Sequence, residues 1–178
     1  YQDHYLKRLR VSDTTDKWFW PTYKDRIVEH ISYFKLQAKN LLRDYKSRTS
    51  YVDKSTGAVL CQYAPKFFDI ESIFLDYNWL DTDCSLMKAQ HLIALMVGFR
   101  KWPDLLNASD AELELARLLF ENQHKIGRED WEMYVMRAEI QNDVIFDVEE
   151  RISIFKNVFL NVEGHVSPFG SYRLDPIK

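Results

Sequence analysis

Apolar side chains recur at three- and four-residue steps along much of the chain, which is the spacing that places them on one face of an α-helix. The first such stretch begins after Thr22, a residue type that caps helix N-termini, and continues to Arg48. Its apolar face carries Ile27, Ile31, Phe34, Ala38, Leu41 and Tyr45. The pattern predicts a long first helix over residues 22–48, with one side in a hydrophobic core.

The helical spacing is lost between Thr49 and Phe68. Polar and turn-forming residues, among them Gly57 and Pro65, surround one short apolar run at residues 58–60. We therefore expect a long loop or a small β-hairpin near residues 49–68.

Helical patterns resume after this segment, and most of them begin at a residue type that suits an N-cap. These residues are Asp69, Ser85, Ser109 and Asp147, the last two with a glutamate at the third helical position that completes a capping box. Gly98 and Gly127 are expected to end the helices before them. The elements predict an all-α fold, an irregular bundle of about six helices.

Composition agrees with this class. The chain has 178 residues, is 46% hydrophobic, and contains only five glycines and five prolines. We expect a single helical domain over residues 1–163 and an extended tail over 164–178, where Pro168, Gly170 and Pro176 interrupt any pattern. Two cysteines and the lack of a signal peptide or long apolar segment favour a cytoplasmic protein without a membrane partner.

The net charge of −3 hides an asymmetry along the chain. Residues 1–54 hold twelve Lys or Arg and seven Asp or Glu, whereas the remainder holds twelve and twenty. Helical spacing aligns four of the cations as a basic ridge: Lys35, Lys39, Arg43 and Lys46. The ridge can bind nucleic-acid phosphates, or it can be the solvated face of a helix that docks on acidic neighbours.

Three aromatic residues outside the helical patterns are candidates for contact with a partner protein or a second copy. Trp18 and Trp20 precede the first helix, and Phe169 lies in the tail. An exposed apolar patch around them would mark an interface.

The sequence predicts no catalytic residue, no metal site and no cofactor. Glu121 and His124 have the Glu-x-x-His spacing of di-iron bundles, but such sites need the motif twice. Cys84 and His91 lack the third polar group of an activated nucleophile. A helix-turn-helix is disfavoured because Pro103 interrupts its second helix.

The stretch from residue 85 to residue 105 resembles a helical segment at the N-terminus of bacterial proteins described as glyoxalase-superfamily proteins. The matching positions are Ser85, Ala89, Leu92, Ile93, Ala94, Gly98, Phe99, Trp102 and Leu105. Upstream, residues 37–41 (Gln-Ala-Lys-Asn-Leu) are similar to an element that precedes it in those proteins. The resemblance implies a helical accessory domain of unassigned activity, without the β-rich metal-binding part that carries glyoxalase catalysis.

These observations favour a non-enzymatic interaction or regulatory module of a bacterial or mobile-element protein, which acts by binding another macromolecule. The alternative is a DNA- or RNA-binding regulator that uses the basic helix at residues 22–48. A third possibility is an enzyme whose site is assembled across helices, because such clusters are invisible in one sequence.

Overall fold

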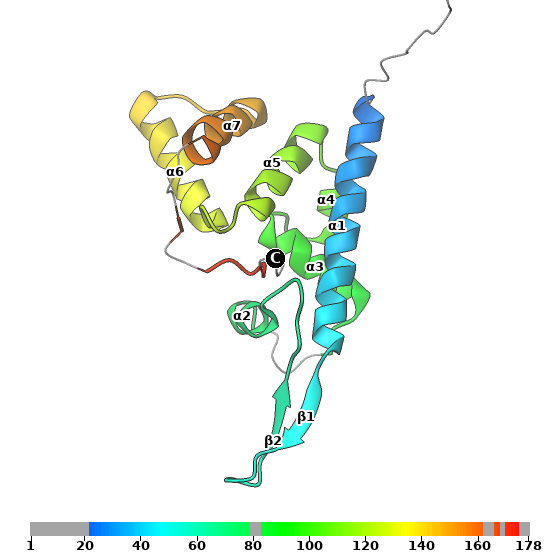
Figure 1. Ribbon diagram of the computed structural model, residues 1–178. Helices are drawn as coiled ribbons and strands as arrows, with labels where there is room; N and C mark the ends of the chain where they lie inside the picture. The colour runs from blue at the N-terminus through cyan, green and yellow to red at the C-terminus, as the bar shows by residue number, and fades with distance from the viewer. Residues whose placement is uncertain (1–21, 79–82, 162–165, 168–169, 175–178) are drawn as a thin grey trace, which may run out of the picture.

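The first helix, α1 (Tyr23–Lys46), runs along one side of the molecule (Figure 1). This computed structural model describes residues 22–78, 83–161, 166–167 and 170–174, and 61% of these described residues are helical. The expected all-α class is confirmed, with seven α-helices in the described part. Thr22 caps α1 as predicted: its hydroxyl accepts from the Asp25 amide, and the Asp25 carboxylate accepts from the Thr22 amide at 2.9 Å.

A β-hairpin follows α1, so the predicted small hairpin is present. Strand β1 (Thr49–Val52) pairs antiparallel with β2 (Val59–Gln62), and Figure 1 shows the hairpin projecting beyond the end of α1. The Asp53 carboxylate organises the turn by accepting from the Ser55 amide at 2.8 Å and from two hydroxyls. Gly57 has φ +70°, a conformation that suits glycine.

The main core lies between α1 and the helices α2 (Ile70–Asp76), α3 (Leu86–Met96) and α5 (Asp110–Glu121), with the short α4 (Trp102–Leu106) beside α3. The caps predicted for these helices are confirmed at Asp69, Ser85 and Ser109. Gly98 takes the left-handed conformation expected after α3, with φ +96°. The helix directly after α3, α4, has only five residues.

A second apolar cluster lies between α5, α6 (Arg128–Asn142), α7 (Val148–Phe155) and the π-helical segment η1 (Lys156–Leu160). Asp147 caps α7 with a capping box, as predicted. The expectation for Gly127 is wrong. Helix α5 already ends at Glu121, and the side chain of the next residue, Asn122, donates to the Leu118 carbonyl. Gly127, with φ −72°, is the N-cap of α6.

The described part of the tail returns to the main core. Phe68 and Arg173 form an antiparallel bridge, and the Asp69 amide donates to the Tyr172 carbonyl at 2.8 Å. The Tyr172 hydroxyl donates to Asp76 at 2.7 Å. Residues 170–174 therefore lie against α2 and the segment that leads into it. Among the described residues, no helix is both long and apolar enough to cross a membrane.

Candidate functional site

Helix α6 is apolar on two opposite sides. On the inner side, Trp131 and Val135 are buried in the second cluster, and the Trp131 ring lies 5.2 Å from that of Phe155. On the outer side, Met133, Met136 and Ile140 are exposed. The spacing of Trp131, Tyr134, Val135 and Ala138 predicts one apolar side of this helix. Trp131 and Val135 are buried as this predicts, but Tyr134 is exposed, and the pattern does not predict the second apolar side.

The outer side continues from the helix into the turn after it. Helical spacing aligns Met133, Met136 and Ile140, and Val144 and Ile145 follow in the turn after the helix. Ile140 is 72% exposed and Ile145 is 87% exposed. We call these five residues the α6 stripe. Contiguous exposed apolar residues of this kind mark interaction sites.

Polar contacts fix the turn that presents the end of the α6 stripe. The Glu139 carboxylate accepts from the Phe146 amide and from the Arg151 guanidinium, each at 3.0 Å. Arg151 also donates to the Phe146 carbonyl at 3.2 Å. Asp143 takes a left-handed conformation at φ 52° and ends the helix. Because this turn is already ordered, it would lose little conformational entropy when a partner binds at Ile145.

Two open grooves lie along α6. One, of about 440 Å³, is lined by the α6 stripe residues Met136, Ile140, Val144 and Ile145 together with Glu139 and Asp143. The other, of about 420 Å³, lies on the other side of Met133, next to Lys125, Tyr134 and Phe159.

Acidic side chains outnumber basic ones in the segment that carries the α6 stripe, where Arg137 is the exposed cation. Residues 128–150 hold eight Asp or Glu and two Lys or Arg. Glu129, Glu132, Asp143 and Glu149 are exposed. A surface with an apolar centre and a negative rim attracts cationic ligands and repels anionic ones.

The basic ridge is exposed, as a binding surface requires. Lys35, Lys39, Arg43 and Lys46 are all exposed on α1. The Arg43 guanidinium donates to Asn40 at 3.0 Å and lies 4.4 Å from the centre of the Phe67 ring. The ion pairs found among the described residues involve other cations. The predicted partner-binding residues Trp18, Trp20 and Phe169 lie outside the described residues.

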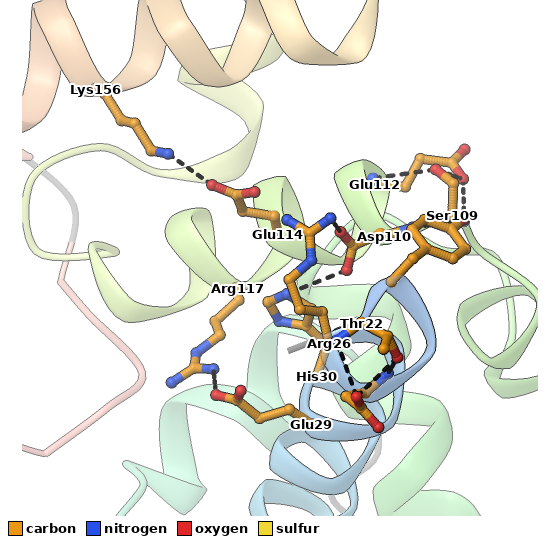
Figure 2. A network of polar contacts seen from close by, with 12 residues as sticks. Thr22, Arg26, Glu29, His30, Ser109, Asp110, Glu112, Glu114, Arg117 and Lys156 are labelled. Atoms are coloured by element: carbon orange, nitrogen blue, oxygen red, sulfur yellow. Dashed lines mark hydrogen bonds and ion pairs between the residues drawn. The ribbon is translucent and has the colours of Figure 1, made fainter. Parts of the chain in front are cut away.

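A polar network joins the N-terminal half of α1 to α5 (Figure 2). Asp110, whose side chain is buried, pairs with Arg26 at 3.0 Å, and Arg117 pairs with Glu29 at 3.0 Å. His30 Nε2 lies 3.9 Å from Asp110 Oδ1, which is too long for a hydrogen bond. Neither groove along α6 is lined by these residues. The network fixes how α1 sits on α5, and the enzyme alternative stays a prediction.

Three of the residues considered for metal or nucleophile chemistry, Glu121, His124 and Cys84, lie at or just beyond helix ends. Glu121 ends α5 and pairs with Arg117, while His124 lies in the turn beyond the helix. Cys84 is buried at the start of α3, and burial raises the pKa of its thiol. Within the described residues, no group of three His, Cys, Asp or Glu side chains is arranged to hold a metal ion.

Cys61 on β2 lies among groups that stabilise its thiolate. Arg48 Nη2 donates to its sulfur at 2.9 Å, and this hydrogen bond, with a second from Ser50, lowers the pKa of the thiol. The thiolate is the nucleophile, so a lower pKa gives a larger reactive fraction near neutral pH. We predict that iodoacetamide alkylates Cys61 faster than Cys84, as followed by mass spectrometry.

Arg48→Ala should raise the pKa of Cys61 and slow its alkylation near neutral pH. The difference in Cys61 alkylation rate between the variant and the parent protein should shrink at alkaline pH, where the Cys61 thiol is ionised in both proteins. Equal rates for Cys61 and Cys84 at neutral pH, or no effect of Arg48→Ala, would contradict this description of the hairpin.

Comparison with known proteins gives no match: no protein-family model, curated protein or solved structure is similar to the chain. The resemblance of residues 85–105 to the glyoxalase-superfamily segment stays a prediction.

Proposed function

We propose that this chain is a non-enzymatic interaction module that binds a partner protein through the α6 stripe. The observation that carries the proposal is that α6 is apolar on both sides. A surface helix needs only one apolar side, the side that faces the core, so the second apolar side of α6 requires another explanation. The outer side of α6 is exposed in the part of the chain that the structure describes, so a partner is expected to cover it.

The acidic rim indicates which partner fits. Two copies of this chain that met stripe to stripe would place their carboxylates against each other, which disfavours a symmetric dimer through this surface. An amphipathic helix with an apolar face and flanking Lys or Arg would fill the grooves and pair with the rim. Methionines support such binding because their flexible side chains adapt to different apolar partners.

A regulatory role in a bacterial or mobile-element protein, and a cytoplasmic location, belong to the same proposal. They are supported by the resemblance of residues 85–105 and by the small number of cysteines. The partner-binding surface does not depend on either point.

The proposal can be tested with a synthetic amphipathic peptide of leucine and lysine, about five helical turns long. We predict that the full chain binds this peptide and binds the matching leucine–glutamate peptide much more weakly. The double variant Met136→Gln/Ile140→Gln should weaken binding about tenfold or more, because it removes two central apolar side chains from the surface. Fluorescence anisotropy of the labelled peptide measures both effects.

A matched control is available on other surfaces. Val28 and Met87 are exposed apolar residues on α1 and α3, and Val28→Gln/Met87→Gln makes the same kind of change away from the α6 stripe. The control should bind the leucine–lysine peptide as the parent protein does. Equal weakening in both double variants, or equal affinity for the two peptides, would count against the proposal.

A further inference from the structure

A second surface, distinct from the α6 stripe, runs along the C-terminal half of α1 and onto the hairpin. Residues 35–54 hold six Lys or Arg and two Asp. Asp44 is 2% exposed and accepts from the Phe67 and Phe68 amides at 2.6 and 2.9 Å. Asp53 is engaged by the turn residues of the hairpin. Neither carboxylate projects freely, so the segment presents mainly positive charge to solvent.

The hairpin is fastened to the end of α1 by contacts at its base. The Ser47 hydroxyl donates to the Asp44 carbonyl at 2.6 Å and accepts from the Ala64 amide at 2.9 Å. The rings of Tyr45 and Tyr63, one on each side of this junction, lie 6.1 Å apart. The ridge and the hairpin therefore form a continuous, ordered strip.

The strip has a length that suits duplex DNA. Lys35 and Lys46 are eleven residues apart on α1, which corresponds to about 16 Å. A four-residue strand adds about 13 Å, and the turn extends the strip further. The total approaches one turn of B-form DNA, about 34 Å.

The hairpin has the shape of a major-groove ribbon. Both strands are almost entirely exposed, and Tyr51, Val52 and Val59 present side chains to solvent. A two-stranded ribbon fits the major groove of B-form DNA, where apolar side chains contact thymine methyl groups. In A-form RNA the same groove is deep and narrow, so the ribbon would not enter it.

We infer that the basic ridge and the hairpin bind duplex DNA, with ridge cations on the phosphates and the hairpin in the major groove. The acidic rim of α6 repels the same ligand, so this binding is separate from that of the α6 stripe. A chain with both surfaces would connect DNA to a cationic partner protein.

The test is binding of the full chain to a labelled DNA duplex of about two helical turns, at a series of salt concentrations. The variant Lys35→Gln/Lys39→Gln/Lys46→Gln should bind at least tenfold more weakly at about 50 mM salt. The slope of log affinity against log salt should become shallower by about two to three, since each phosphate that a cation neutralises contributes about 0.9 to it. The control Lys24→Gln/Arg100→Gln/Lys101→Gln changes the net charge equally at exposed positions elsewhere, and it should bind within about twofold of the parent protein.

The hairpin is tested separately by Tyr51→Ser/Lys54→Gln, which should weaken DNA binding several-fold and leave the unfolding temperature of the chain unchanged. A matched RNA duplex and vesicles containing phosphatidylserine serve as competitors, and both should compete poorly. Undetectable DNA binding at low salt, or equal losses of DNA affinity in the two triple variants, would overturn the inference. So would an unchanged DNA affinity of the hairpin variant, or equal or tighter binding to RNA or vesicles. The variant Met136→Gln/Ile140→Gln should bind DNA as the parent protein does. DNA binding and peptide binding by the α6 stripe are therefore tested independently.

Discussion

Trp131→Ala is expected to lower the free energy of unfolding by about 3–5 kcal/mol. Trp131 is 1% exposed at the centre of the second apolar cluster. Its ring lies 5.2 Å from Phe155 and 5.6 Å from Phe159 in edge-to-face arrangements. Removal of the indole leaves a cavity between α6, α7 and η1. The cluster is small, so few neighbouring side chains can move into this cavity.

Chemical denaturation followed by circular dichroism measures this loss. Met133→Ala on the outer side of α6 is the control, and it should change stability by less than about 1 kcal/mol because Met133 is exposed. If Trp131→Ala were as mild as Met133→Ala, the assignment of inner and outer sides of α6 would be wrong.

Asp44→Ala is expected to lower the free energy of unfolding by about 3 kcal/mol, because the buried Asp44 carboxylate accepts hydrogen bonds from two backbone amides. These amides belong to Phe67 and Phe68, and the Phe68 side chain is 1% exposed in the main core. Without the carboxylate, both amides lose their partner and the segment that leads to α2 is released from α1.

Asp44→Asn keeps an acceptor oxygen in the same place, so it should cost clearly less than Asp44→Ala. Asp53→Ala removes a carboxylate from the exposed hairpin turn and should have a small effect on global unfolding. The same denaturation measurement compares the three variants. Equal costs for Asp44→Ala and Asp53→Ala would contradict the role given to Asp44.

Helix starts were predictable from the sequence because their signals are local. Thr22, Ser85, Ser109 and Asp147 each cap a helix as expected, through contacts that span only three residues. The end of α5 was not predictable from Gly127. An asparagine side chain that returns to a helix carbonyl stopped α5 earlier, and one sequence does not show which of two competing signals acts first.

The two candidate surfaces also differ in how far the sequence predicts them. The basic ridge was predictable because four cations at helical spacing must share a face. The α6 stripe was not, because apolar residues on two sides of a helix do not show which side the core covers. Asp44 was likewise missed, since a carboxylate in a basic helix gives no sign that amides of a distant segment will bury it.

The central claim is that the outer side of α6 binds a cationic amphipathic helix. The most direct measurement is a nuclear magnetic resonance titration of the isotopically labelled full chain with the leucine–lysine peptide. The account predicts that backbone signals of residues 133–145 shift most, while those of the basic ridge from Lys35 to Lys46 stay unchanged. The largest shifts on α1, or no saturable shift on α6, would contradict it.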